Sequence, residues 1–241
     1  MVLLYQFLGS HFCEKARFAL DFKGVSYTAV NLIPGPHLKV TKKIADKSSL
    51  PILADNGNVI QGSAEIITYL DKRHLHPALT PMNPADRSLS LEWERYLDRN
   101  LAVPFRLCFY FEALEDRTMA TDFLLRGAPW WGRPLYAVIY PGLRRKMCKL
   151  MDINANSANA AQAQLVATFD KLDERISKHK FLAGSQFSRA DLTAAALLFH
   201  RWSNDWPAPP EFGRFMDTHR QRPFYKWAGA IYERCREGSK T

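Results

Sequence analysis

The chain has 241 residues, 47% of them apolar, so it can bury a substantial core and lies near the length at which one core gives way to two domains. Its 33 basic and 24 acidic side chains give a formal charge of +9, which favours anionic ligands. The basic residues are spread along the chain without a recognition motif, so we expect no nucleic-acid partner.

The four cysteines, Cys13, Cys108, Cys148 and Cys235, have no CxxC or CxxH spacing. This predicts neither a metal site nor a dense disulfide framework and favours a reducing compartment, so we expect a cytoplasmic protein. No window reaches the ~18 apolar residues of a membrane span, and no basic segment before a long apolar run opens the chain. We therefore expect neither a transmembrane helix nor a signal peptide.

The first 32 residues have the pattern of a strand, a helix and a second strand. The apolar run 2–7 predicts a buried strand, and 25–32 predicts another. Between them, apolar residues recur at helical spacing after Ser10, and Gly24 marks the end of that helix. A crossover helix of this length predicts that the two strands are parallel.

The next segment has the pattern of a short helix, a hairpin and a helix. Residues 34–36 form a Pro-Gly-Pro loop, and 37–47 is a short basic segment. Asn56-Gly57 between two apolar runs is a strong hairpin signal, and Pro51 can begin the first strand because its missing N–H does no harm there. Gly62-Ser63 then begins a helix that ends near residue 74.

Beyond residue 76 the pattern is helical, which indicates a second domain. A proline-rich linker at 77–86 separates an α/β domain at 1–76 from an all-α domain at 87–241. Helices are expected at 85–115 with a kink at Pro104, at 158–179, at 192–199 after a capping box at Ser188, and after Pro223. The aromatic and basic segment 126–149 could pack as ordinary loop and helix, cover a ligand pocket, or touch a membrane surface.

Ser10 and Cys13 lie where the first strand delivers the chain to a helix N-terminus. The unpaired amides and partial positive charge of such an end stabilise a thiolate, either that of Cys13 or that of a bound ligand. The site therefore favours sulfur chemistry. The alternative is that Ser10 is only a helix cap and Cys13 only a small buried side chain.

The order of these elements resembles that of the glutathione S-transferases, of a serine- or cysteine-using, bacterial-like type. The resemblance is carried by four segments: Ser10 ahead of Arg17, Leu50-Pro51, 62–70 (GSAEIITYL), and 181–184 (FLAG) followed by Ser188 and Asp191. It implies a thioredoxin-like glutathione-binding domain followed by an all-helical domain. It also implies a homodimer that conjugates glutathione to a hydrophobic electrophile, as in detoxification.

The resemblance also suggests roles for particular residues. Pro51 is expected to be cis, so that the backbone of Leu50 meets the cysteinyl part of glutathione. The γ-glutamyl carboxylate is expected at Gly62 and Ser63, where a helix N-terminus can bind an anion, and the glycyl carboxylate at His37 or Lys39. The catalytic candidates are Ser10, Cys13 and Tyr5, and the candidates for a second-substrate pocket are Phe105, Phe109, Tyr110 and Trp206.

Two departures from the family pattern leave the function open. Gly62 stands where the family has Gln, Glu or Asp, so one contact to glutathione is lost unless Gln61 replaces it, and Glu65 stands where the family has Ala. Two other functions therefore remain: a glutathione-dependent thiol–disulfide oxidoreductase that uses Cys13, and a binding protein of the same fold without catalysis.

Overall fold

The computed structural model describes residues 1–202, 206 and 208–237. The N-terminal domain contains β1 (Val2–Gln6), α1 (His11–Phe22), β2 (Thr28–Asn31), α2 (His37–Ile44), β3 (Ile52–Asp55), β4 (Asn58–Gln61) and α3 (Ser63–Arg73). The strands form one mixed sheet in the order β2-β1-β3-β4, with β1 parallel to β2 and antiparallel to β3. The predicted thioredoxin-like arrangement is confirmed.

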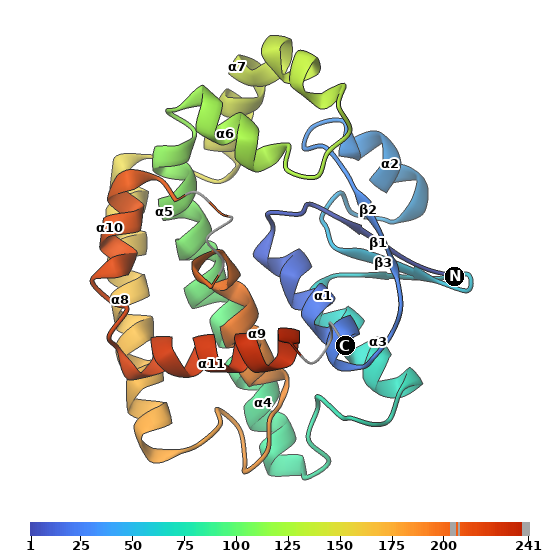
Figure 1. Cartoon of the computed structure of the whole chain (residues 1–241), viewed down its shortest axis with the longest axis vertical. Helices are drawn as coiled ribbons and strands as arrows, with labels where there is room; N and C mark the ends of the chain where they lie inside the picture. Colours follow the sequence, from blue (N-terminus) through green and yellow to red (C-terminus); the bar gives the residue numbers. More distant parts are fainter. Residues whose placement is uncertain (203–205, 207, 238–241) are drawn as a thin grey trace.

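The helices of this domain cover the sheet on both sides. Leu4 of β1 and Leu53 of β3 pack in one buried cluster with residues of α1 and α3, on the side that faces the helical domain, while α2 lies away from that side (Figure 1). The predicted hairpin joins β3 and β4, and its turn residues Asn56 and Gly57 have φ of 47° and 86°. Asn and Gly are the residues that adopt such positive φ most readily, so this turn follows directly from the sequence.

The C-terminal domain is helical among the residues that the structure describes, as predicted. Its helices are α4 (Pro84–Leu97), a π-helical turn (Asp98–Ala102), α5 (Val103–Ala113), α6 (Arg117–Leu124), α7 (Gly132–Leu150), α8 (Ala155–Lys178), α9 (Arg189–Leu197), a 3-10 turn (Phe199–Arg201), α10 (Pro210–Asp217) and α11 (Pro223–Glu237). No helix in the described part of the chain is long and apolar enough to cross a membrane. The exact limits of the two domains stay a prediction; α3 ends at Arg73 and α4 begins at Pro84.

The single kinked helix expected at 85–115 is instead two helices joined by the π-helical turn. Pro104 has no N–H to donate to the carbonyl of Asn100, one turn earlier. That carbonyl accepts a hydrogen bond from the Thr168 hydroxyl of α8 at 3.0 Å instead. The break therefore lies just before Pro104, and its polar groups are satisfied by a neighbouring helix.

A buried ion cluster joins the two domains. Lys15 of α1 lies 2.9 Å from both Glu94 of α4 and Asp98, and Arg189 of α9 lies 2.6 Å from the other oxygen of Glu94. Arg189 also donates at 2.8 Å to the carbonyl of Ala64 in α3. Lys15, Glu94 and Arg189 are each at most 2% exposed, so each charge depends on its partners to offset the cost of burial.

Glu94→Gln tests how much this cluster contributes to stability. We expect it to lower the free energy of unfolding by about 3–5 kcal/mol, because it leaves Arg189 buried without a counter-charge and Lys15 with Asp98 as its remaining partner. Glu174→Gln is the matched control, since Glu174 pairs with Lys178 in a bridge where both side chains are at least 64% exposed. Urea denaturation of the wild type, Glu94→Gln and Glu174→Gln measures the three free energies of unfolding. Equal stability of both variants would show that the cluster is not what holds the domains together.

His200 forms a second link between the domains. Its Nε2 donates a hydrogen bond to the carbonyl of Gly9 at 2.8 Å, and its ring is stacked with Phe105 and Phe109. Burial lowers the pKa of His200 to about 3 from its usual 6.5. The ring is therefore neutral in the folded protein near neutral pH.

A buried neutral histidine makes stability depend on pH. Its folded pKa lies below its unfolded value, so the unfolded chain binds the proton first and stability falls as the pH drops from about 6.5 towards 3. At ~1.4 kcal/mol per pH unit, we expect the wild type to lose about 2 kcal/mol more than His200→Gln between pH 7.5 and 5.0. Gln keeps an N–H donor for Gly9 but carries no titrating group. Urea denaturation at the two pH values measures this difference, and equal losses would contradict it.

Candidate active site

The loop between β1 and α1 presents Ser10 at the start of α1. The Ser10 hydroxyl accepts a hydrogen bond from the backbone N–H of Cys13 at 3.4 Å, so Ser10 is the N-cap of this helix. Two side chains hold the loop behind it: Arg17 donates at 3.0 Å to the carbonyl of Leu8, and His200 donates to that of Gly9. Because the hydroxyl uses only a lone pair as cap, it can also donate its proton, either to the sulfur of Cys13, with which it is within hydrogen-bond range, or to an acceptor in the cavity.

Cys13 lies on the other side of the same helical turn, in the core. Its side chain has no exposed surface, and it does not line the cavity described below. Burial raises the pKa of the Cys13 thiol, which opposes formation of the thiolate. With the helix capped at Ser10, the first turn directs Cys13 inward.

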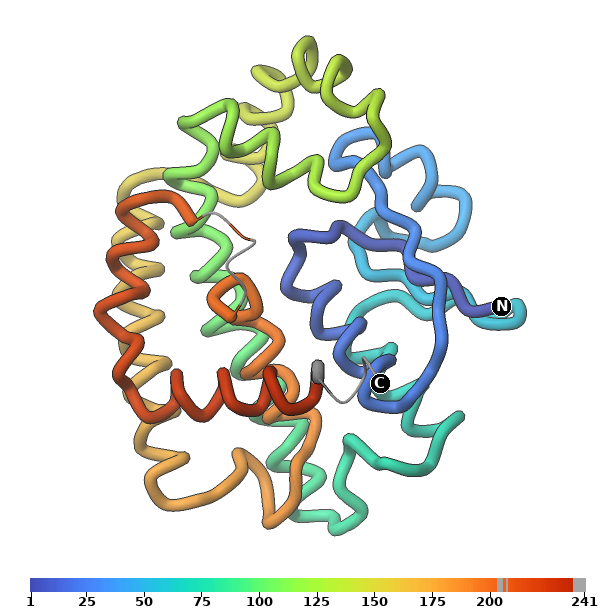
Figure 2. Tube along the Cα trace, viewed as in Figure 1, coloured from blue at the N-terminus to red at the C-terminus, as the bar shows by residue number. Residues whose placement is uncertain are grey.

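A cavity of about 530 Å³ opens beside Ser10, between the N-terminal domain and the helical domain. The β1–α1 loop and the segments 34–38 and 48–50 form one wall, and α5, α6 and α7 form the other. Figure 2 shows α6 and α7 extending over the top of the N-terminal domain, towards α2. Most of the segment 126–149 belongs to helix α7. Its residues Leu143, Lys146 and Met147 line the cavity.

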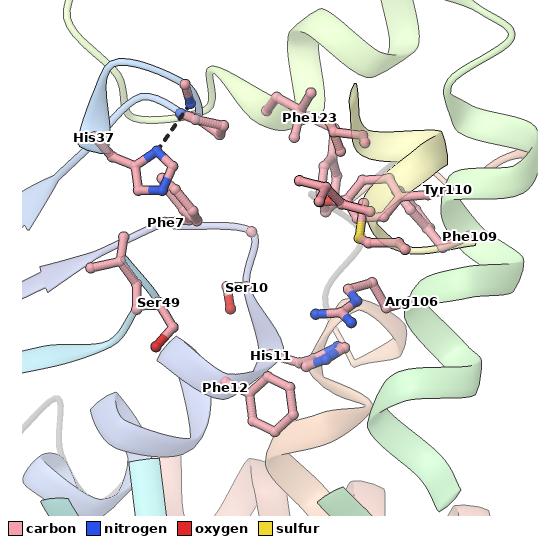
Figure 3. Close-up of a pocket in the computed structure, with 18 of the residues that line it drawn as sticks. Phe7, Ser10, His11, Phe12, His37, Ser49, Arg106, Phe109, Tyr110 and Phe123 are labelled. Carbon is pink, nitrogen blue, oxygen red and sulfur yellow. Dashed lines mark hydrogen bonds between the residues drawn. The ribbon is translucent and has the colours of Figure 1, made fainter. Parts of the chain in front are cut away.

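The wall formed by the helical domain is largely aromatic. Three of the four residues predicted for a second-substrate pocket, Phe105, Phe109 and Tyr110, line the cavity, and Phe123 lies with them (Figure 3). The fourth, Trp206, lies behind Phe123 at a ring distance of 5.5 Å and borders a different, shallow depression. Trp206 was expected from composition alone, which carries no information about the direction of a side chain.

The peptide bond between Leu50 and Pro51 is cis, as predicted, and Leu50 lines the cavity. The loop just before it is held by Gln61, whose side-chain amide donates to the carbonyls of Lys47 and Ser49 at 2.7 Å each. Gln61 is therefore occupied with this loop and is not free to replace the missing side chain of residue 62.

The backbone at residue 62 accounts for its glycine. Gly62 has φ of 107°, a conformation that strains any other residue, and the carboxylate of Glu65 lies where a Cβ would be. Ser63 follows as the first residue of α3 and is 6% exposed. Its hydroxyl makes no hydrogen bond with another described residue, so it does not cap the helix.

The basic groups around the cavity differ from those expected. His37 lines it, with Nδ1 accepting a hydrogen bond from the backbone N–H of Gly35 at 3.0 Å (Figure 3). Burial lowers the pKa of His37. Lys39 is exposed and does not line the cavity, whereas Lys146 of α7 lines it within electrostatic range of His37.

Tyr5 does not line the cavity. It lies inside β1, paired with Val30 of β2 and Ile52 of β3. Arg106, Lys146 and His200, which do line the cavity, were not identified from the sequence. Arg106 and His200 come from parts of the chain distant from Ser10, and nothing local in the sequence marks them, whereas Lys146 belongs to the basic segment 126–149 for which a pocket cover was one of the alternatives.

Models of two protein families match the chain. The N-terminal domain of glutathione S-transferases matches residues 4–78, and the C-terminal domain of the same family matches residues 136–223. A probable glutathione S-transferase of Solanum tuberosum is 33% identical over 98 residues, which are 39% of this chain and 44% of that protein. Glutathione S-transferase Z2 of Arabidopsis thaliana is 30% identical over 122 residues, 49% of this chain and 54% of that protein. The chain thus spans about half the length of the curated relatives it matches.

Solved structures share the fold over nearly the whole chain. A glutathione S-transferase of Ceriporiopsis subvermispora in complex with glutathione has a TM-score of 0.70 at 17% identity and covers 97% of each chain. A beta-etherase from Sphingobium has a TM-score of 0.65 at 19% identity, over 94% of this chain and 98% of its own. Because the two family models together match well over half of its residues, the chain belongs to the glutathione S-transferase family.

Proposed function

We propose that the protein conjugates glutathione to a hydrophobic electrophile, with Ser10 as the residue that acts on sulfur. The observation that carries this proposal is the position of the Ser10 hydroxyl, which is fixed as the cap of α1 and borders a cavity with an aromatic opposite wall. A hydroxyl that donates to a bound thiolate stabilises it relative to the thiol and so lowers the pKa of glutathione.

Glutathione would use groups on the N-terminal side of the cavity and, beside them, Ser63. Ser63 does not itself line the cavity, but it follows Gly62, whose N–H donates to the carbonyl of Pro51 at 3.0 Å, next to the lining residue Leu50. The γ-glutamyl carboxylate of glutathione would accept from Ser63 and the first amides of α3, where the positive end of the helix favours an anion. Its cysteinyl part would pair with the backbone of Leu50, and its glycyl carboxylate would meet His37 and Lys146. Lys146 replaces Lys39 in this account because Lys39 does not border the cavity.

The reaction is a displacement at an electron-poor carbon. The thiolate sulfur forms a bond to that carbon, and the leaving group departs with the electron pair of its own bond, as chloride does from a chloronitrobenzene. The thiol proton is lost to solvent before attack. Ser10 keeps its proton throughout and only stabilises the anion.

Burial of Cys13 supports conjugation over the oxidoreductase alternative. A nucleophilic thiol needs access to its disulfide partner and a low pKa, and Cys13 has neither. The non-catalytic alternative rested on Gly62, and the positive φ at this position gives its glycine a structural reason. The homodimer and the cytoplasmic location that the family resemblance and the cysteines suggest are further parts of this proposal.

Ser10→Ala tests the proposal directly. We expect kcat/KM for glutathione and a chloronitrobenzene to fall at least tenfold, a loss of at least ~1.4 kcal/mol of transition-state stabilisation. The pKa of bound glutathione, followed by ultraviolet absorbance of its thiolate, should rise in the same variant. Ser10→Thr, which keeps both the hydroxyl and the helix cap, should restore much of the activity.

Cys13→Ala is the matched control, because alanine leaves no unpaired polar atom in the core. We expect its activity to stay within a few-fold of the wild type. If Cys13→Ala loses activity while Ser10→Ala keeps it, and mass spectrometry finds a glutathione adduct on Cys13, the enzyme is an oxidoreductase and the proposal fails.

A further inference from the structure

Among the residues that the structure describes, those that line the cavity carry positive charge and no carboxylate. Two residues with permanently or normally charged side chains line it, Arg106 from α5 and Lys146 from α7, and no Asp or Glu is among the described residues that do so. The remaining surface is mostly apolar, with Phe105, Phe109 and Phe123 prominent. A cavity of this kind favours a ligand that combines an apolar body with an anionic group.

Arg106 is a cation without a counter-charge. By contrast, the largely buried cations of α1 and α9 named above are paired: Lys15 with Glu94, Arg17 with Glu14, and Arg189 with Glu94. Arg106 is half-buried, yet it forms no ion pair or hydrogen bond with another residue in the described part of the chain. A guanidinium keeps its proton, so the N–H groups of Arg106 remain available to an anionic or acceptor group of a ligand in the cavity.

The guanidinium is directed into the cavity. Figure 3 shows it extending from α5 towards the side where Ser10 and His11 lie. His11 and Tyr110 lie within its electrostatic range: burial lowers the pKa of His11, and the positive charge of Arg106 lowers it further. Neither His11 nor Tyr110, the two titratable groups of the described residues within this range, offers Arg106 a negative charge near neutral pH.

The two cations lie at different parts of the cavity. Lys146 is within electrostatic range of His37, beside the loop before α2. Arg106 lies across from Ser10, on the helix that carries Phe105 and Phe109. One cation is thus available for glutathione, and the other for a second molecule next to the aromatic wall.

We propose that Arg106 binds an anionic group of the second substrate, so that the cavity selects aromatic or otherwise apolar electrophiles that carry a carboxylate or sulfonate. The planar guanidinium matches such groups with paired hydrogen bonds. The identification of the ligand as a second substrate rests on the proposed conjugation, but the binding preference itself does not.

A pair of fluorescent dyes tests this preference without any reaction. Anilinonaphthalene sulfonate and N-phenyl-naphthylamine share an aromatic body and differ in the sulfonate. We expect Arg106→Gln to weaken binding of the sulfonate dye about tenfold and to change that of the neutral dye by less than about threefold, as for loss of a charge-assisted hydrogen bond. Arg106→Lys, which keeps the charge, should bind the sulfonate dye with an affinity between those of the wild type and Arg106→Gln.

Arg145→Gln is the control, because this substitution removes the same charge from a residue that is exposed on α7 and does not line the cavity. We expect it to bind both dyes as the wild type does. An equal loss for both dyes in Arg106→Gln, or an equal loss of the sulfonate dye in Arg145→Gln, would overturn the proposal.

Kinetics then separate this inference from the conjugation on which it partly rests. The electrophiles are a chloronitrobenzoate and its methyl ester, and each enzymatic rate is divided by the uncatalysed rate to remove their difference in reactivity. Arg106→Gln should raise KM about tenfold for the acid and leave KM for the ester unchanged. The KM for glutathione should not change; a rise there would assign Arg106 to glutathione and overturn the inference. If no electrophile reacts with the wild type, the proposed function fails while the dye result still decides the preference of Arg106.

Discussion

The shared carboxylate of Glu94 is the interaction on which the arrangement of the two domains depends. It holds Lys15 of the first helix and Arg189 of a helix in the second domain, and all three side chains are buried. A buried ion cluster tolerates little displacement, because any charge that loses its partner stays desolvated. The cluster therefore fixes α1 against the helical domain, and with it the distance across which Ser10 faces the aromatic wall.

The site itself is built from a loop whose backbone is held at two successive carbonyls. Arg17 binds the carbonyl of Leu8, and His200 binds that of Gly9, so the cap residue Ser10 follows a segment with little freedom to move. Catalysis by a hydroxyl requires such positioning, since one hydrogen bond to sulfur contributes only if its geometry is prepared in advance. Because α1 is capped at Ser10, Cys13 is directed inward. The same helix start therefore favours the proposed role of Ser10 and disfavours Cys13 as a nucleophile.

The parts of this molecule that could be predicted from the sequence are those set by local chemistry. Asn56-Gly57 specifies the hairpin turn, and Ser188 specifies the capping box of α9. The order of strands and helices indicates the fold. The direction of Cys13 could not be predicted, because it depends on whether the helix starts at Ser10 or two residues later. Arg106 was missed for another reason: only packing of the helical domain brings it to the cavity, and no spacing relates it to Ser10. For Lys146 the sequence offered only the possibility that the segment 126–149 covers a pocket.

The most direct test of the account is isothermal titration of the wild-type chain with glutathione and with S-hexylglutathione. The account predicts that both bind, with one site per chain, and that Ser63→Ala weakens both by about tenfold because a hydroxyl that bonds a carboxylate is lost. The S-hexyl group should add affinity, since the account places the sulfur at Ser10 and the same cavity is lined by Phe105, Phe109 and Tyr110. Absence of binding for both ligands would contradict the account and leave a protein that keeps the family's fold without its co-substrate.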